Sequence, residues 1–433
     1  MIKKWLNHSK KSLGGDFFKH VATLMAGTVA GQVIVFAFTP ILSRLFTPDD
    51  FTTLEQFTMI LSIAVVVITG KYEFAIMHPK EEKDARQLVN LSALLALFGS
   101  LVFFVLGWFF SEPIGQYYQN PTLGKYFWML GPALLGFAIF NITNYWFSRK
   151  KQFKIAAVSK VYNSAAGEPI KWLAGIQNYG TLGLLGGTVI GFIIGGIYCG
   201  LQYLRDQGKQ WMSIEWSRMK AQARIHRDLP LFSIWGSILN RTAQWAHVGI
   251  FTHFYGLAAI GLMALCRRVM LAPLNIVSAS YSQVFFQRIS EMENADHLYK
   301  LYFKALIQFL LMASVMVIAV WLLPYNTMGF IFGESWTSSI EYLRLLSFWY
   351  AFNFVTASLS FIVIRIQMQR IGLILDALHF VLIYASIIAA HYFNCSEIEA
   401  VKWLVIAKVI YFTVHIFTIQ WQLQRYVQKA QLP

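Results

Sequence analysis

Apolar runs long enough to cross a membrane recur along the whole chain, with only short polar connections between them. A helix needs about 20 predominantly apolar residues to cross a hydrocarbon core of about 30 Å. The sequence holds twelve such runs, at residues 19–42, 54–77, 87–110, 125–147, 155–176, 182–202, 228–253, 259–287, 300–323, 340–364, 371–391 and 398–422. The pattern predicts an all-α integral membrane protein with about twelve transmembrane helices.

Composition supports this class and argues against a soluble enzyme. Hydrophobic residues make up 57% of the 433 residues and charged residues only 13%, whereas about a quarter of a typical globular domain is charged. The sequence has no usable phosphate loop, metal-spaced His and Cys set or nucleophile elbow. We therefore expect no catalytic residues, no metal site and no cofactor. A membrane polysaccharide polymerase or glycosyltransferase stays as the enzyme alternative, although the external connections are short for such an enzyme.

Lysines and arginines gather in alternate connections, which predicts the orientation of the chain. Lys80, Lys83 and Arg86 follow the second predicted span, whereas the opposite connections carry almost nothing beyond Arg44. Because basic residues mark cytoplasmic connections, we expect both termini in the cytoplasm and Asn120 and Ser396 outside. The net charge of +15 is then explained by topology, without a nucleic-acid partner.

Two internal repeats predict two lobes. RLFTPDDFTTLEQF from Arg44 aligns without a gap on HFYGLAAIGLMALC from His253, so that Thr52 and Gly261 each open the second helix of a pair. A second repeat aligns Arg149 with Arg365. An even number of helices in each copy predicts six-helix lobes related by an axis along the membrane normal.

The longest basic connection is the predicted boundary between these lobes. The expected parts of the chain are a cytoplasmic N-terminus at 1–18, an N-lobe at 19–202, a cytoplasmic linker at 203–227, a C-lobe at 228–422 and a cytoplasmic tail at 423–433.

Polar residues in the seventh span follow helical spacing. Ser233, Ser237, Asn240, Gln244 and His247 are four, three, four and three residues apart and form one stripe. Lipid cannot face such a stripe, and Gln32 in the first span adds a polar group in the other lobe. A shared water-filled cavity is the favoured interpretation, and hydrogen bonding between helices is the alternative.

Three arginines lie inside apolar spans. Each arginine at the centre of a membrane costs roughly 2.5 to 3.5 kcal/mol on the most lenient scale, and Arg241, Arg267 and Arg268 have no acidic residue close by in the sequence. A negatively charged substrate or a water-filled cavity could offset this cost. Because the planar guanidinium donates two hydrogen bonds to adjacent oxygens, these arginines are candidate ligands of a phosphate-bearing substrate.

Buried acids are candidates for ion coupling. Glu73, Glu168 and Asp376 lie in predicted spans and are as compatible with H⁺ or Na⁺ binding as with structural ion pairs. Lys171, three residues after Glu168, favours a structural pair there.

The sixth span carries Gly183, Gly187, Gly191 and Gly195 at four-residue spacing. This spacing bares one strip of helix backbone and predicts close packing on another helix of the same lobe, with a sliding surface as the alternative.

Four stretches in a matching order resemble a known family. They are LSRLFTPDDF, YEFAIMHPKEEKDA, YWFSRKKQFKIAAVSK and FYGLAAIGLMALCRRVMLAPLNIVSASYSQVFFQRISE. They resemble the Wzx-type polysaccharide flippases of the multidrug, oligosaccharidyl-lipid and polysaccharide exporter superfamily, over nearly the whole chain. The resemblance implies a V-shaped transporter of two lobes that turns over undecaprenyl-pyrophosphate-linked oligosaccharide by alternating access in the bacterial inner membrane.

The resemblance also assigns roles to residues and partners. Arg268, five residues before Pro273, matches the cavity arginine of related lipid II flippases. The chain lacks the two further helices of those flippases, and between His20 and Ser43 it lacks the buried acid typical of multidrug exporters, which stay as the alternative class. We expect Arg241 and Arg268 to bind the pyrophosphate while the polar stripe binds sugar hydroxyls. The expected partners are the lipid-linked oligosaccharide, membrane lipids, and a polysaccharide polymerase with its chain-length regulator, around a monomeric transporter.

Overall fold

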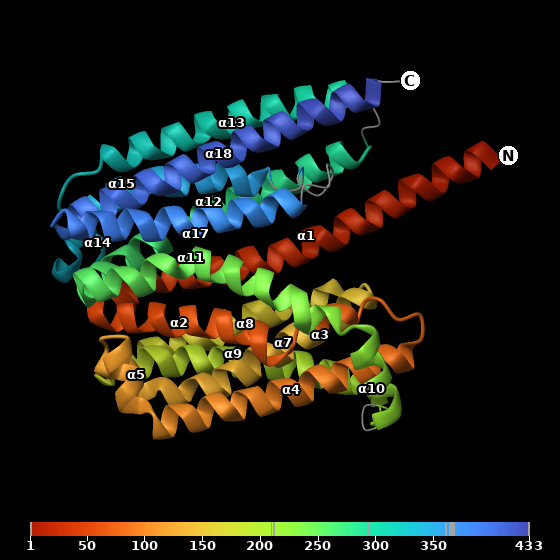
Figure 1. Cartoon of the computed structure of the whole chain (residues 1–433), viewed down its shortest axis with the longest axis horizontal. Coiled ribbons are helices and arrows are strands. Elements are labelled where there is room, and N and C mark those ends of the chain that lie inside the picture. The colour runs from red at the N-terminus through yellow and green to blue at the C-terminus, as the bar shows by residue number, and fades with distance from the viewer. Residues whose placement is uncertain are drawn as a thin grey trace. The chain divides into compact units, whose positions relative to one another are not determined.

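The computed structural model describes residues 2–208, 210, 213–291, 295–359, 362 and 369–431, and this part of the chain is helical without a β-strand. The long helices are α1 (Ile2–Ser43), α2 (Pro48–Ile68), α4 (Glu82–Phe109), α7 (Leu130–Arg149), α8 (Phe153–Ile176), α9 (Thr181–Gln207), α11 (Ile234–Tyr255), α12 (Leu257–Glu291), α13 (Ala295–Trp321), α15 (Ser339–Ser358), α17 (Gln369–Tyr392) and α18 (Glu397–Gln431). The short helices are α3 (Tyr72–Ala75), α5 (Ser111–Tyr117), α6 (Pro121–Tyr126), α10 (Trp216–Ile225) and α14 (Thr327–Phe332) (Figure 1).

The membrane class predicted from the apolar runs is confirmed. Nine helices within the described residues are long and apolar enough to cross a membrane. The fifth, seventh and tenth predicted spans overlap with α8, α11 and α15, which have 24, 22 and 20 residues. The count of twelve spans stays a prediction.

Contacts divide the chain into two units, which we describe separately. The N-terminal unit is Thr23–Gly261, and the C-terminal unit is Leu262–Pro433 together with Met1–Ala22. This grouping places α11 with the preceding helices, because α11 packs along α2. The lobe boundary predicted at 203–227, and the axis relating the lobes, stay predictions.

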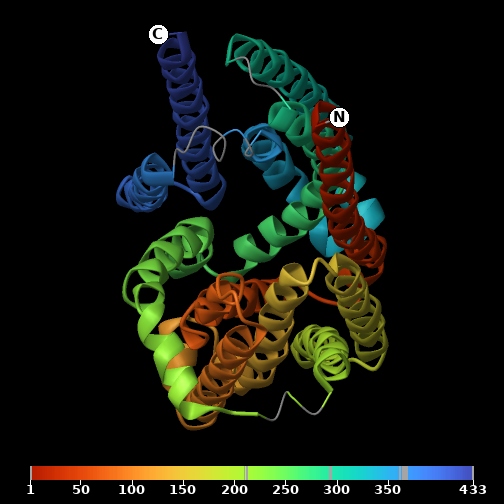
Figure 2. The same ribbon diagram turned by 90° about the vertical axis from the view of Figure 1, so that its right-hand side faces the viewer.

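In the N-terminal unit, α9 packs against both α7 and α8, and α7 packs against α4 (Figure 2). The glycine strip of α9 makes its contact with α8 close. A Cβ added at Gly187 would lie 2.8 Å from the Gly167 oxygen of α8, and one at Gly191 would lie 2.8 Å from the Asn163 oxygen. The predicted packing of the strip within one lobe is therefore observed.

The start of α2 follows from its sequence. Thr47 and Asp50 form a reciprocal capping box, in which the Thr47 backbone N–H donates to Asp50 Oδ2 at 2.9 Å, and Pro48 occupies the first turn. Pro48 aligns in the sequence repeat with Leu257, which begins α12. Both copies of the repeat therefore start a helix at the same aligned position.

One accessibility expectation was wrong. Asn120 is only 1% exposed. Its side chain caps α6 by accepting from the Leu123 backbone N–H at 3.1 Å and donates to Gln56 Oε1 at 2.7 Å. A polar residue in a short connection was expected to face water, but the connection folds back on α2 and uses Asn120 to satisfy a helix end.

In the C-terminal unit, α18 packs against α13, α15 and α17, and α13 packs against α15 (Figure 1). Its core contains large buried side chains such as Trp336, Tyr302 and Phe309. These helices provide the environment of a buried polar pair described below.

Candidate functional site: a cationic cluster on α11 and a polar cavity

The polar stripe of α11 meets a lysine that lies outside the stripe. Lys71 Nζ donates a short hydrogen bond to Ser237 Oγ and lies 3.5 Å from the Ser233 carbonyl oxygen. Lys71 follows α2 in the chain, so this contact joins residues 166 positions apart. The stripe therefore binds a cation of its own unit.

Arg241 adds a second positive charge beside this lysine. Arg241 lies one turn beyond Ser237 on α11 and its side chain is exposed. Arg241 and Glu73 are the charged groups that act electrostatically on the Lys71 ammonium. Two cations, one half-buried and one exposed, thus border a row of serine and amide groups, an arrangement suited to an anion.

The backbone holds Lys71 in an uncommon conformation. Gly70 and Lys71 have φ values of 60° and 58°, and the left-handed region is unfavourable for a residue with a side chain. The Lys71 backbone N–H is 3.4 Å from Thr69 Oγ1. This turn ends α2 and directs Lys71 to α11.

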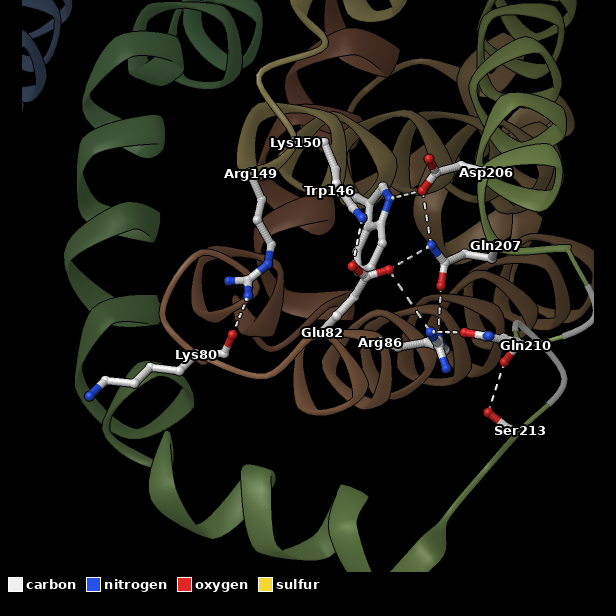
Figure 3. Close-up of polar contacts among 10 residues, drawn as sticks. All are labelled: Lys80, Glu82, Arg86, Trp146, Arg149, Lys150, Asp206, Gln207, Gln210 and Ser213. Atoms are coloured by element: carbon white, nitrogen blue, oxygen red, sulfur yellow. Dashed lines mark hydrogen bonds and ion pairs between the residues drawn. The ribbon is translucent and has the colours of Figure 1, made fainter.

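The segment after Lys71 is tied to neighbouring elements. Tyr72 Oη donates to the Ala223 carbonyl of α10 at 3.2 Å. Arg149 at the end of α7 donates to the carbonyl oxygen of Ile76 at 3.2 Å. It also donates to the carbonyl oxygen of Lys80 at 3.3 Å (Figure 3). These bonds fix the position from which Lys71 reaches α11.

A polar network next to Arg149 joins three helices (Figure 3). Arg86 of α4 donates from Nε to Gln207 Oε1 of α9 at 2.7 Å. Lys150 Nζ lies 2.6 Å from Glu82 Oε2, and Trp146 Nε1 of α7 donates to Asp206 Oδ2 at 2.9 Å. Each charged side chain in this network has a hydrogen-bond or ion-pair partner within it, so we interpret it as structural.

The remaining candidates on α11 differ in exposure. Asn240 is half-buried and accepts from Gln244 Nε2 at 2.8 Å, whereas Gln244 is exposed. His247 is buried. The end of the stripe near Ser237 is therefore accessible, and the end near His247 is enclosed.

Gln32 lies in a separate cavity of the same unit. The cavity has a volume of about 240 Å³, and α1, α7, α8 and α9 line it. Its polar lining includes Lys160, whose Nζ donates to Thr28 Oγ1 at 2.8 Å, and Asn163. Phe137, Phe140 and Phe192 supply apolar walls. A cavity with amides, hydroxyls, one ammonium and aromatic rings suits a sugar.

Sequence reasoning missed both lysines. Neither Lys71 nor Lys160 was among the candidate residues. The signal for Lys160 was a lone basic residue about one and a half turns inside a predicted span, which is costly unless it has a purpose.

The other arginine candidates belong to the C-terminal unit. Arg267 and Arg268 lie on α12 and are both half-buried. Cys266 beside them is buried and donates to the Ser339 carbonyl of α15 at 3.3 Å. The predicted joint action of Arg241 and Arg268 involves both units and stays a prediction.

The candidate acids have different surroundings. Glu168 and Lys171 form the expected pair, with 2.6 Å between Oε1 and Nζ and both side chains buried. Glu73 is buried on α3. Asp376 lies on α17, and its charge acts on Tyr411 of α18. An ion-coupling role of any of these acids stays a prediction.

Solved structures with the same fold are membrane transporters. The lipid II flippase MurJ in an inward closed conformation matches with a TM-score of 0.70 at 14% identity, over 94% of this chain and 90% of that one. An inward-facing multidrug resistance MATE family transporter of the MOP superfamily matches with 0.65 at 13% identity, over 95% and 96%. A MOP superfamily transporter from Pyrococcus furiosus matches with 0.59 at 12% identity, over 96% and 97%.

Sequence comparison gives the family. No curated protein matches the chain by sequence. The profile of a family described as polysaccharide biosynthesis protein matches residues 41–341, more than half of the chain. The chain thus belongs to the polysaccharide biosynthesis protein family and has the fold of the MOP superfamily of membrane transporters.

Proposed function

We propose that this protein is a flippase that moves undecaprenyl-pyrophosphate-linked oligosaccharide repeat units across the bacterial inner membrane by alternating access. Its membership of a polysaccharide biosynthesis family supports a glycan substrate. A fold shared with the lipid II flippase MurJ supports a lipid-linked one.

The observation that carries the proposal is the cationic cluster that Lys71 and Arg241 form at α11. Lys71 bonds to Ser237 while Arg241 is exposed one turn away. A pyrophosphate carries several negative oxygens, and an arginine fork and an ammonium are suitable donors to them. A positive cluster inside a membrane protein costs free energy, which an anionic substrate would offset.

The polar groups near the cluster suit the sugar part of the substrate. Asn240, Gln244 and Ser237 supply amides and a hydroxyl on one face of α11, and the cavity at Gln32 and Lys160 offers a second set with aromatic walls. Such contacts are individually weak. Weak contacts suit transport, because the substrate must be released on the far side.

The remaining roles belong to the same proposal. Arg268 and Arg267 act on the pyrophosphate from α12, and Glu73, Glu168 and Asp376 are the candidate carriers of a coupling H⁺ or Na⁺. The protein works as a monomer with both termini in the cytoplasm, next to a polysaccharide polymerase and its chain-length regulator.

Flipping of lipid-linked oligosaccharide by purified protein in proteoliposomes tests the proposal. We expect Arg241→Ala and Arg268→Ala each to slow flipping by about tenfold or more, because each loses a bidentate contact worth about 1.5 to 3 kcal/mol. Arg268→Lys should restore only part of the rate, because lysine keeps the charge but loses the fork. Arg227→Ala, at an exposed position between α10 and α11, is the matched control and should flip normally.

Two results would contradict the proposal in whole or in part. One is a wild-type protein that moves no lipid-linked oligosaccharide but exports cationic dyes, which would favour a multidrug exporter. The other, normal flipping by both alanine variants, would overturn the pyrophosphate-binding role of the arginines and leave them with a packing role, although the flippase activity itself would stand.

A further inference from the structure

The C-terminal unit contains a buried pair of basic side chains that the proposed function does not use. Lys408 on α18 is 1% exposed, and His379 on α17 is 6% exposed. Lys408 Nζ lies 2.9 Å from His379 Nε2. A hydrogen bond between two bases needs one proton between the two nitrogens, because one must donate and the other accept.

Aromatic rings surround this pair. Lys408 Nζ lies 4.2 Å from the centroid of the Trp349 ring on α15, a cation–π position that stabilises the ammonium form. The His379 ring stacks on Tyr411 with centroids 4.0 Å apart and planes 11° from parallel. Tyr411 in turn stacks on His415 at 5.8 Å. These contacts leave the pair little freedom to separate.

Charged and titratable groups lie on each of the helices around the Lys408–His379 pair. On α17, Asp376 lies one turn before His379 and acts on Tyr411. On α15, Arg344 donates to the Leu323 carbonyl at 2.8 Å. On α13, Tyr299 accepts from Gln420 and Gln424, about three and about four turns beyond Lys408 on α18. The other charged or titratable residues on these helices include His297, Lys300 and Lys304, which are exposed, Lys402, which is exposed near the start of α18, and His415, which is half-buried.

We infer that Lys408 and His379 form a proton-binding site, which alternates between a singly charged and a neutral form during the transport cycle. This inference rests on the proposed function for its coupling to transport, but the proton binding itself does not.

The geometry permits this exchange at low cost. In the charged form the Lys408 ammonium donates to His379 Nε2, and the imidazole carries its proton on Nδ1. When one proton leaves to water, the imidazole can carry its remaining proton on Nε2 and donate it to the Lys408 amine. The hydrogen bond therefore survives in both forms, and the net change is one proton and one charge. A second proton would put two cations 2.9 Å apart in a buried site, which strongly disfavours a doubly charged form.

The tautomer of His379 gives a direct test that is independent of transport. In ¹⁵N-histidine NMR of purified protein, with His379 assigned by its loss in His379→Gln, we expect Nε2 to change from unprotonated to protonated as pH rises. At low pH, His379 should not become an imidazolium, because the Lys408 ammonium lies 2.9 Å from its Nε2. In Lys408→Met, the Nε2 switch should disappear and imidazolium should form at a pH at least about one unit higher than in the wild type.

Transport assays test the coupling. In proteoliposomes with a pH gradient, Lys408→Met and His379→Gln should lose the dependence of flipping on the gradient, whereas Lys402→Met at an exposed site on the same helix should keep it. If Lys408→Met does not fold, His379→Gln gives the same answer, because glutamine can hydrogen-bond to lysine but does not titrate.

The outcomes distinguish the proton-binding site from its coupling to transport. If His379 becomes an imidazolium at low pH in the wild type and Lys408→Met leaves that titration unchanged, the proton site is overturned whatever the protein transports. If the tautomer switch occurs, and flipping by Lys408→Met and His379→Gln still depends on the pH gradient as it does in the wild type, the site exists but the coupling is overturned. If the wild type moves no oligosaccharide, the proposed function and the coupling fail together, and the NMR result still decides the site.

Discussion

Thr52 Oγ1 donates a hydrogen bond of 2.5 Å to the carbonyl oxygen of Leu257. Thr52 lies in the first turns of α2, and Leu257 is the first residue of α12. In the sequence repeat, Gly261 aligns with Thr52 and Pro48 aligns with Leu257. Gly261 and Pro48 are also in contact, since a Cβ added at Gly261 would lie 2.0 Å from the Pro48 oxygen. The two aligned helix starts therefore pack on each other through equivalent positions.

This close approach predicts that Gly261→Ala destabilises the protein. The new methyl group would clash with backbone, which cannot move aside as a flexible side chain would, so we expect a loss of about 1 to 3 kcal/mol. Thermal unfolding in detergent measures it. Gly249→Ala on α11, where a Cβ would only meet Met59 Sδ at 4.0 Å, is the control, and an equal effect in both variants would contradict the prediction.

Lys71 should contribute to substrate binding as well as to the fold. Lys71→Ala should slow flipping of lipid-linked oligosaccharide by about tenfold, because a charge-assisted contact is lost. Ser237→Ala, which removes the hydroxyl but keeps the ammonium, should have a smaller effect. A rate in Lys71→Ala equal to that of the wild type, with normal thermal stability, would remove Lys71 from the proposed site.

The buried Glu168–Lys171 pair predicts an asymmetry between single and double variants. Glu168→Ala leaves the Lys171 ammonium buried without its carboxylate and should cost about 3 to 5 kcal/mol. The double variant Glu168→Leu with Lys171→Met should be closer to the wild type, because neither charge is left. Thermal unfolding distinguishes them. If the double variant is stable but loses ion-dependent transport, Glu168 is an ion carrier.

Stability should fall in mildly acidic solution because His226 is partly buried next to His78. The rings of His78 and His226 stack with centroids 5.7 Å apart, and burial, with a smaller effect of His78, lowers the pKa of His226 below its ordinary value of 6.5. The unfolded chain then binds the proton at a higher pH than the folded one. Stability is therefore unaffected well above pH 6.5, starts to fall as pH drops through that value, and stops falling below the lowered pKa.

Thermal unfolding across this pH range checks the effect. His226→Gln should flatten the acid side of the profile, whereas His391→Gln at an exposed position should not. An unchanged profile in His226→Gln would assign the acid sensitivity to other groups.

The predicted topology can be checked with single cysteines in a cysteine-free background. Tyr117, the last residue of α5, is 79% exposed and replaces the buried Asn120 as the probe on this side. Cysteines at Tyr117 and Ser396 should react with an impermeant maleimide from outside intact cells, and one at Lys151 should react only after permeabilisation. The reverse pattern would invert the orientation.

Features within one helix were predictable from the sequence. The glycine strip of α9, the Glu168–Lys171 pair and the capping box at Thr47 all depend on spacings of three or four residues. Helix geometry places such residues on one face or at one helix end, so the spacing alone determines which residues share that face or that end. The apolar runs similarly determined the all-α membrane class, because backbone groups in a membrane must be satisfied within a helix or a barrel.

Contacts between distant segments were decided only by the tertiary structure. The sequence did not indicate that Gln32 and Lys160 line one cavity, and the predicted cavity shared by Gln32 and the α11 stripe stays a prediction. Lys71 with Ser237 and Lys408 with His379 join residues 166 and 29 positions apart. The cost of burying a charge predicts that a partner must exist, but the partner depends on which helix faces meet. That choice comes from side-chain packing between helices, which residue spacing along one helix does not determine.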